Sequence, residues 1–433
     1  MDPGLLMYNL VALPAWGLLP AVGVGLGLAG RWGEIGPRLG LYRHLAPAGP
    51  GPRVWLQAVS VGEVGVAQAV AEELWRLEPR VELTVSASTV KGLERARQVL
   101  GQKALVAPFP LEAPWAVAAA WQRLRPQVYA SLETEIWPNQ LAWFERRGTA
   151  LLLLNGRLSP RSFPRYQKVR PLVAAALRRF RVLSMISPED ARRAVLLGAP
   201  AQRVRVDGNA KYAGLTERAR PELLAGPAAM LALGGRPLLV AGSARSGEEG
   251  PVLEAFQEVL ASHPMAMLAV APRHVERAPR WLLACAQRGL LAQRWTELSS
   301  TAPRREATQV VVVDVMGQLL GLYGLAKAAF LGASLVPLGG QNPMEPAAWG
   351  VPCLYGPSME DFADAAQALA QAGAGQTVSD GPALARAWRE MLDHPAQASA
   401  QGQAGRRVVA AWSGAAATAA SLIVEQLDRQ GAL

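Results

Sequence analysis

The stretch FLGASLVPLGGQNPMEPAAWGVPCLYGP, residues 330–357, decides how the second half of this chain folds. Its pattern predicts the end of a buried strand (AAFLGAS, from residue 328), a turn rich in Gly and Pro, a helix that opens at about Pro343, and a short strand, PCLYGP. Gly339 and Gly340 let the backbone turn where a side chain would clash. The stretch therefore indicates one strand–turn–helix unit of a parallel α/β sheet.

The start of this helix is a candidate anion site. Its free N–H groups and the positive end of its dipole suit a phosphate or a carboxylate. Glu345 lies in the first helical turn, where it can accept hydrogen bonds from sugar hydroxyls beside such an anion. A plain glycine turn followed by a helix-start acid is the alternative.

The same alternation of apolar runs and helical patterns extends outward from this stretch. Predicted strands lie at 54–60, 81–88, 104–110, 127–133, 150–156, 181–187 and 204–209, and then at 237–243, 267–272, 309–315, 328–334 and 352–357. Helical patterns between most of them predict two Rossmann-like, doubly wound α/β domains facing across a cleft. Ligands of such sheets bind beyond the carboxyl ends of the strands.

The predicted domain boundaries follow from composition. Residues 31–212 form the first domain, a Gly/Ala/Pro-rich stretch at 213–235 reads as a linker, and residues 236–433 form the second domain. A helical stretch at 406–427, with a break at Ser413-Gly414, closes the second domain. The length of 433 residues suits two domains of ordinary size.

The first 30 residues are predicted to be a membrane anchor. Residues 3–30 carry no charge and are long enough to cross a bilayer as a single helix. Pro14 and Pro20 interrupt the segment, so a helix lying in the interface is the alternative. The arginines that follow, beginning with Arg31, predict that the body of the protein lies on the cytoplasmic side of the inner membrane.

Composition narrows the partners and excludes some kinds of site. A formal charge of +10 and a pI near 10.1 point to an anionic partner: phospholipid, a phosphorylated substrate or nucleic acid. Cys285 and Cys353 are isolated, which suits a reducing compartment, and the histidines are well separated, so no metal site is predicted. The sequence contains no nucleophilic triad and no Walker loop.

Two strand ends in the first domain carry candidate site residues. Ser60, Gly62 and Glu63 stand at the first strand-to-helix turn, where a helix N-terminus would keep the Glu63 carboxylate ionised, as a general base requires. Glu133 and Glu135 follow another strand beside Trp137 and Pro138. The alternative for each acid is a helix cap or an ion pair.

A basic run without acids is a candidate contact for anionic lipid or for a phosphorylated lipid substrate. A solvated basic face is the alternative. Its members are Arg157, Arg161, Arg165, Lys168, Arg170, Arg178, Arg179 and Arg181.

Three strand ends in the second domain carry polar groups. Ser243 to Glu249 follow the first strand, Pro272-Arg273-His274 the second, and Asp314 to Leu319 the third. Arg273 suits a phosphate by charge and fork geometry, whereas a lone His274 is more often structural.

The motifs in this order resemble those of 3-deoxy-D-manno-octulosonic acid (Kdo) transferases. The resemblance covers nearly the whole chain and rests on SVGE (60–63), ETEIWPN (133–139), LNGRLSPRSF (154–163), GNAKY (208–212), PRHVER (272–277), DVMGQLLGLY (314–323) and GASLVPLGGQNPMEPAAWGVP (332–352). It implies the GT-B fold and an inverting transfer from CMP-Kdo to a phosphorylated lipid A-type acceptor in lipopolysaccharide synthesis, without metal, cofactor or nucleic acid.

The resemblance also implies residue roles. Glu63 would be the catalytic base, with Ser60, Gly62, Glu133, Glu135, Arg157 and Arg161 on the acceptor side. The donor would be held by Ser243, Arg245, Pro272, Arg273, His274, Met316, Gly317, Gly339, Gly340, Gln341, Asn342 and Glu345, with Glu345 on the ribose.

Three departures from the family pattern put the sugar in doubt more than the reaction. Gln341 stands where the family usually has His, Gln318 where it has Glu, and Ala244-Arg245 where it has Thr-His. Alternatives are therefore a transferase with another donor or acceptor, a nucleotide-sugar epimerase on the same fold, or a non-catalytic glycolipid or nucleotide binder.

Overall fold

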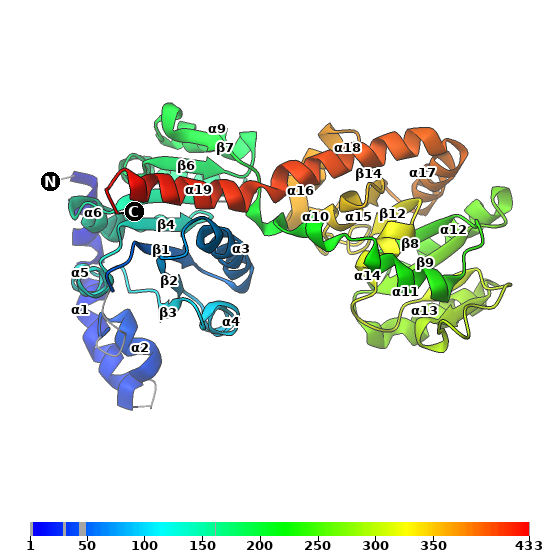
Figure 1. Ribbon diagram of the computed structural model, residues 1–433, viewed down its shortest axis with the longest axis horizontal. Helices are drawn as coiled ribbons and strands as arrows, with labels where there is room; N and C mark the ends of the chain where they lie inside the picture. The colour runs from blue at the N-terminus through cyan, green and yellow to red at the C-terminus, as the bar shows by residue number, and fades with distance from the viewer. Residues whose placement is uncertain (1–2, 29–31, 43–48, 161, 433) are drawn as a thin grey trace. The chain divides into compact units, whose positions relative to one another are not determined.

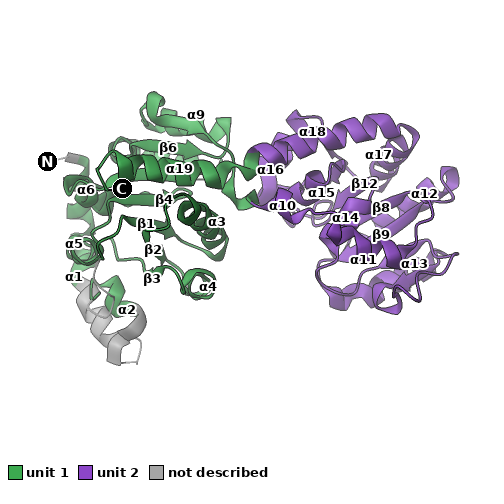
Figure 2. Ribbon diagram, in the orientation of Figure 1, with its two compact units in different colours: residues 1–213, 412–433 green, residues 214–411 purple. Residues whose placement is uncertain are grey.

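The chain folds into two α/β units. The computed structural model describes residues 3–28, 32–42, 49–160 and 162–432. Unit 1 comprises residues 1–213 and 412–433, and unit 2 comprises residues 214–411 (Figure 2). The predicted pair of doubly wound domains is thus confirmed.

Unit 1 is built on a seven-stranded parallel sheet in the order β3-β2-β1-β4-β5-β6-β7 (Figure 1). Its strands are β1 Arg53–Ala58, β2 Glu82–Ala87, β3 Leu105–Pro108, β4 Val128–Leu132, β5 Ala150–Gly156, β6 Val182–Met185 and β7 Val204–Val206. Its helices are α1 Pro3–Leu28, α2 Trp32–Arg38, α3 Val61–Leu77, α4 Val90–Leu100, α5 Pro114–Leu124, α6 Pro138–Arg146, α7 Phe163–Lys168, α8 Arg170–Leu177, α9 Pro188–Leu197 and α19 Ala415–Asp428, with short turns η1 Ala201–Arg203 and η2 Ala210–Tyr212.

Helices cover both faces of this sheet, which explains its uninterrupted apolar strands. Because side chains alternate along a strand, Val54 and Leu56 of β1 enter one core with α3, α4 and α19. Trp55 enters the opposite core beside Tyr129 and Phe144. Both layers are needed to bury β1, since Trp55 and Leu56 are fully buried neighbours on opposite faces.

Unit 2 repeats the plan with the order β10-β11-β9-β8-β12-β13-β14, again all parallel. Its strands are β8 Leu238–Ala244, β9 Met267–Pro272, β10 Ala292–Arg294, β11 Val310–Val312, β12 Ala328–Leu331, β13 Cys353–Tyr355 and β14 Gly375–Thr377. Its helices are α10 Leu215–Arg218, α11 Glu222–Leu231, α12 Glu249–Ser262, α13 Ala278–Gln287, α14 Leu319–Leu325, α15 Met344–Ala348, α16 Ala363–Gln371, α17 Gly381–Asp393 and α18 Pro395–Ser413, with short turns η3 Val275–Arg277, η4 Trp295–Glu297 and η5 Glu360–Phe362.

The edge strands of unit 2 were not predicted. β10 and β14 are three residues each, with the sequences AQR and GQT, and have no apolar run to mark them. Every strand that the sequence did predict is present, with ends shifted by a few residues. The buried centre of each sheet was therefore readable and the edges were not.

The structure divides the chain differently from the predicted boundaries. Residues 214–235, expected as a linker, form α10 and α11, and α11 buries Pro227 and Leu231 within unit 2. The closing helical stretch does break after Ser413, but α19 belongs to unit 1, where Ile423 and Leu427 lie in the core. Composition alone could not show which sheet this helix covers.

A membrane-spanning anchor at residues 3–30 is not supported. Among the described residues, the helical run long and apolar enough to cross a membrane is Pro395–Asp428, which contains α18 and α19, and α19 is part of the unit 1 core. The apolar segment found near the N-terminus, Gly4–Pro14, is short. In α1, Leu5 and Trp16 are buried, and Trp16 packs on Ala113 and Ala116 of unit 1.

Candidate active site

Many of the sequence-predicted site residues lie at the point in each sheet where the strand order reverses. In unit 1 this point lies between β1 and β4, and in unit 2 between β8 and β12. Connections leave in opposite directions there, so the loops after the two strands separate and leave room for a ligand. The candidate residues Ser60, Gly62, Glu63, Glu133 and Glu135 follow the first pair, and Ser243, Arg245 and Gly339–Glu345 follow the second.

Glu63 lies in the first turn of α3 with its side chain folded back over the helix start. Its carboxylate accepts hydrogen bonds from the Val59 amide at 2.8 Å and from the Ser60 hydroxyl at 3.2 Å. Ser60 is the helix N-cap, and a Cβ on Gly62 would make only an ordinary contact with Ser60 Oγ, at 3.8 Å. This backbone contact at the helix start is similar to that of a capping box.

Burial opposes the ionisation predicted for Glu63. Burial, followed by the charge of Glu133, raises the pKa of Glu63 from its ordinary 4.5 to about 7, against the lowering effect of the Val59 amide. The helix N-terminus is outweighed because Glu63 is 7% exposed and a second carboxylate, Glu135, adds to the repulsion. A pKa near neutrality suits a base that must release the proton it takes up.

Glu133 and Glu135 lie near enough to Glu63 for their charges to raise its pKa. Glu133 sits at the end of β4 in a left-handed conformation, with φ 55°. Glu135 accepts a hydrogen bond from Trp137 Nε1 at 2.8 Å, and burial raises its pKa to about 7. The structure therefore brings Glu63, Glu133 and Glu135 together, because β1 pairs with β4 and the charges of Glu133 and Glu135 act on Glu63.

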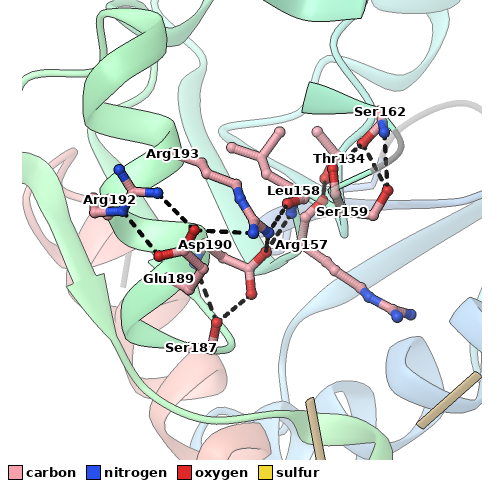
Figure 3. A network of polar contacts seen from close by, with 10 residues as sticks. All are labelled: Thr134, Arg157, Leu158, Ser159, Ser162, Ser187, Glu189, Asp190, Arg192 and Arg193. Carbon is pink, nitrogen blue, oxygen red and sulfur yellow. Dashed lines mark hydrogen bonds and ion pairs between the residues drawn. The ribbon is translucent and has the colours of Figure 1, made fainter. Parts of the chain in front are cut away.

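The loop after β5 is tied down by residues that the sequence analysis missed (Figure 3). Asp190, near the start of α9, accepts a hydrogen bond from the Leu158 amide at 2.7 Å, and Arg193 donates to the Leu158 carbonyl at 2.7 Å. Thr134 donates to the Arg157 carbonyl. The Ser187-x-x-Asp190 spacing is a helix-start signal and could have identified the anchor.

Of the two arginines assigned to the acceptor side, Arg157 and Arg161, the structure describes Arg157. The Arg157 guanidinium points away from the Asp190–Arg193 pair (Figure 3). Arg161 lies outside the described residues.

In unit 2, the glycine turn of the first-quoted stretch is confirmed. Gly339 and Gly340 have φ of 83° and 78°, and a Cβ on them would approach Asp361 and Met359 to 2.6 and 2.4 Å. The helix begins at Met344 as expected, but α15 ends at Ala348 and is too short to carry a substantial dipole. The predicted anion seat thus depends on the loop more than on the helix.

Asn342 and Glu345 line the end of that loop beside Gln341. Asn342 Oδ1 accepts from the Met344 amide at 3.1 Å, and its Nδ2 lies 3.5 Å from Glu345 Oε1. Burial raises the pKa of Glu345, while the charge of Arg218 on α10 opposes the rise. The α10 segment, expected as linker, therefore supplies a charge to the site.

A cationic group forms where the loops after β8 and β9 meet. Arg245 Nη1 lies 2.6 Å from His274 Nε2. Since a guanidinium can only donate, His274 Nε2 is the acceptor of this contact, and His274 Nδ1 lies 3.6 Å from Glu276 Oε1. Arg273 is exposed beside them, its amide bonded to the Ala244 carbonyl at 2.9 Å, while Pro272 ends β9 and Ser243 has φ 54°.

Met316 and Gly317 follow β11, two strands from β8. Met316 is 67% exposed and Gly317 has φ 89°. In the described part of the chain, no three His, Cys, Asp or Glu side chains are grouped so that they could hold a metal ion.

Comparison with known proteins identifies the family. The model of a family described as 3-deoxy-D-manno-octulosonic-acid transferase (kdotransferase) matches residues 33–214. The 3-deoxy-D-manno-octulosonic acid transferase of Haemophilus influenzae is 30% identical over 404 residues, covering 92% of each chain. The chain belongs to the Kdo transferase family. The 3-deoxy-D-manno-octulosonic acid transferase of Bordetella pertussis is 29% identical, and the alignment covers 89% of this chain and 90% of that protein.

Solved structures confirm the GT-B-type fold of this Kdo transferase family member. The UDP-GlcNAc 2-epimerase of Neisseria meningitidis, solved with UDP-GlcNAc, aligns with a TM-score of 0.58 over 87% of this chain and all of its own, at 12% identity. At that identity the likeness shows the fold alone. Membership in the Kdo transferase family makes the chain a glycosyltransferase and sets the epimerase alternative aside.

Proposed function

We propose that this protein transfers Kdo, or a closely related acidic sugar, from its CMP-linked form to a phosphorylated lipid A-type glycolipid, with Glu63 as general base. The observation that carries the proposal is Glu63 itself: a buried carboxylate with a pKa of about 7, facing two further acids at the strand-order reversal of unit 1. Family membership supplies the sugar.

The reaction follows as a single displacement. Glu63 takes the proton of an acceptor hydroxyl while that oxygen bonds to the anomeric carbon of the donor and the bond to the CMP phosphate breaks. Attack from the side opposite the leaving group inverts the anomeric centre. A base with a pKa near the working pH is partly ionised before the step and holds the proton after it.

Donor binding is assigned to unit 2. Arg273 and the Arg245–His274 pair offer donors for the phosphate that leaves. The loop through Gly339, Gly340, Gln341 and Asn342, with Met316 and Gly317, would enclose the cytidine monophosphate, and Glu345 would accept from the ribose hydroxyls. Because Gln341 cannot become a cation and Arg245 is one, the charges offered to the donor differ from the family pattern, and a different acidic sugar is the second candidate donor.

Lipid contact is assigned to α1 and the basic run that includes α7 and α8. The inward side of α1 packs on unit 1, and its other side exposes Leu6, Met7, Leu10, Val11 and Leu13. α1 lies against α8, and Arg165, Lys168 and Arg170 are exposed. An apolar stripe next to cations suits a helix lying in the interface of an anionic membrane, with the catalytic units on the cytoplasmic side.

The test is sugar transfer from CMP-Kdo to a tetra-acylated lipid A precursor in detergent, by wild type, Glu63→Gln and the control Glu72→Gln. Glu72 is an exposed acid on the same helix. We expect wild type and control to transfer, and Glu63→Gln to lose most of its turnover, about 10²-fold or more, while keeping its affinity for CMP. Normal turnover in Glu63→Gln would end the general-base assignment, and wild type that binds CMP without transfer would point to another sugar or acceptor.

A further inference from the structure

Glu248 is a fully buried carboxylate held by backbone amides alone. It is 0% exposed. One oxygen accepts from the Arg245 amide at 2.7 Å and the Ala333 amide at 2.8 Å, and the other from the Ser334 and Leu335 amides, each at 3.1 Å. Convergent amides of this kind form an anion-binding nest. Here the protein's own side chain fills it.

The amides come from the two loops that separate at the strand-order reversal of unit 2. Arg245 follows β8 and Ala333 follows β12, the strands between which the order reverses. The backbone is unusual on both sides, because Ser243 and Ala333 have φ of 54° and 60°. Such conformations in residues with a Cβ persist only where their surroundings hold them. The Glu248 carboxylate bonds to both loops.

Hydrogen bonds lead from this carboxylate to the glycine turn. The Gly340 amide donates to the Ala333 carbonyl at 2.9 Å. Ser334 Oγ accepts from the Gly356 amide at 2.7 Å, and the Ser334 carbonyl from the Ser358 amide at 3.1 Å. Ser358 Oγ in turn accepts from the Gly339 amide at 2.9 Å. The conformation of Gly339–Gly340 therefore depends on segments that Glu248 fixes.

We propose that Glu248 is a positioning residue for the donor: its carboxylate acts as an internal anion that locks loop 333–345 to the loop after β8. Its effect on the nucleotide-sugar rests on the proposed function, and its effect on the loop does not. Charge-assisted hydrogen bonds from four amides cannot be replaced by an uncharged side chain of the same shape, since the amide group of Gln would face donors with a donor.

The experiment compares Glu248→Gln with the matched control Glu249→Gln. Glu249 is the neighbouring acid, and it accepts from the Gly247 amide within its own loop at 2.7 Å. We expect Glu248→Gln to raise the KM for CMP-Kdo about 10-fold or more, with kcat at saturating donor and the KM for the acceptor within about 2-fold of wild type. Glu249→Gln should behave as wild type. Equal losses for donor and acceptor, or none, would overturn the proposal.

Chemical rescue tests the internal anion directly. Glu248→Ala leaves the nest empty, so added formate should lower its KM for CMP-Kdo, whereas Glu248→Gln, whose side chain fills the space, should not respond. No response of the alanine variant overturns the assignment. If both variants fail to fold, Ser358→Ala, which breaks the same path at Gly339, must raise the KM for the donor.

Amide hydrogen exchange keeps the two proposals distinguishable. Residues 333–340 should exchange faster in Glu248→Gln than in Glu249→Gln, whatever the enzyme transfers. Unchanged exchange overturns the role of Glu248. Faster exchange, in a protein whose wild type shows no transfer, overturns the proposed function alone.

Discussion

Several residues at the strand ends have a raised carboxyl pKa or a positive φ angle, and the surrounding residues maintain these states. Glu63 carries a proton affinity raised by burial and by Glu133. Glu133 and Asn155, at the ends of β4 and β5, both have φ 55°. In unit 2, Ser243 and Ala333 have similar φ angles of 54° and 60°. Strained backbone and perturbed carboxyls at the same sheet edges are typical of binding and catalytic sites.

The charge of Glu133 gives the pH profile a direction. Glu63 works as a base only when ionised, so kcat/KM should fall as the pH drops below about 7. Glu133→Gln removes the largest electrostatic contribution to the raised pKa of Glu63, so the acid limb should move to lower pH by roughly a few tenths of a unit to one unit. The measurement is kcat/KM against pH for both proteins.

An acid limb that stays in place or moves to higher pH would show that Glu133 does not act on the titrating base. Glu145→Gln serves as control, because this exposed acid pairs with Arg179 on α8's C-terminal side. Its profile should match wild type.

At this scale, the sequence predicted residues that lie in short-range patterns. Glu63 follows a strand within a helix start, and Gly339-Gly340 is a turn by composition, so both were found. Glu248 and Asp190 were missed as site anchors because their partners, Ala333 and Leu158, lie far away in the chain. The raised pKa of Glu63 was also beyond the sequence, since burial is a property of the fold.

At the scale of secondary-structure elements, α15 and α19 both depend on segments that are distant in the chain. α15 is a brief helix after a long loop, so the loop must be fixed by other segments. α19, in contrast, is long, and its residues Ala420, Ile423 and Leu427 pack in the core of unit 1. The last strand of that sheet in the sequence, β7, ends at Val206, far before α19. Its apolar pattern predicted a helix but not the unit that it covers.

The contribution of α19 can be measured with one side chain. Ile423 is fully buried, so Ile423→Ala should lower the free energy of unfolding of unit 1 by about 2–5 kcal/mol. The control Glu425→Ala removes an exposed i,i+4 pair with Arg429 and should cost at most about 0.5 kcal/mol. The measurement is urea unfolding, monitored by amide hydrogen exchange of the residues in α3, which packs on α19. Equal effects of the two substitutions would contradict the core assignment.

The whole molecule carries a formal charge of +10, and one part of that charge is assigned to the lipid. Reversing Arg165, Lys168 and Arg178 to Glu should raise the KM for the lipid acceptor about 5- to 20-fold at low salt, with a smaller effect at roughly 0.5 M salt, where exposed charges are screened. Initial rates at both salt concentrations test this.

A matched control reverses Arg386, Arg406 and Arg407 of unit 2, which are exposed and change the net charge equally. If both triple variants respond alike, net charge alone is responsible and the basic run is a solvated face.

The passage of α19 into unit 1 has a consequence for synthesis. A ribosome releases the strands of the first sheet early, but the helix that covers one of its faces emerges only after all of residues 214–411. All of unit 2 has therefore been synthesised while unit 1 still exposes part of its core. Unit 1 can complete its folding only after α19 has been synthesised. A premature stop codon before Ala415 would therefore damage the unit whose strands had all been translated.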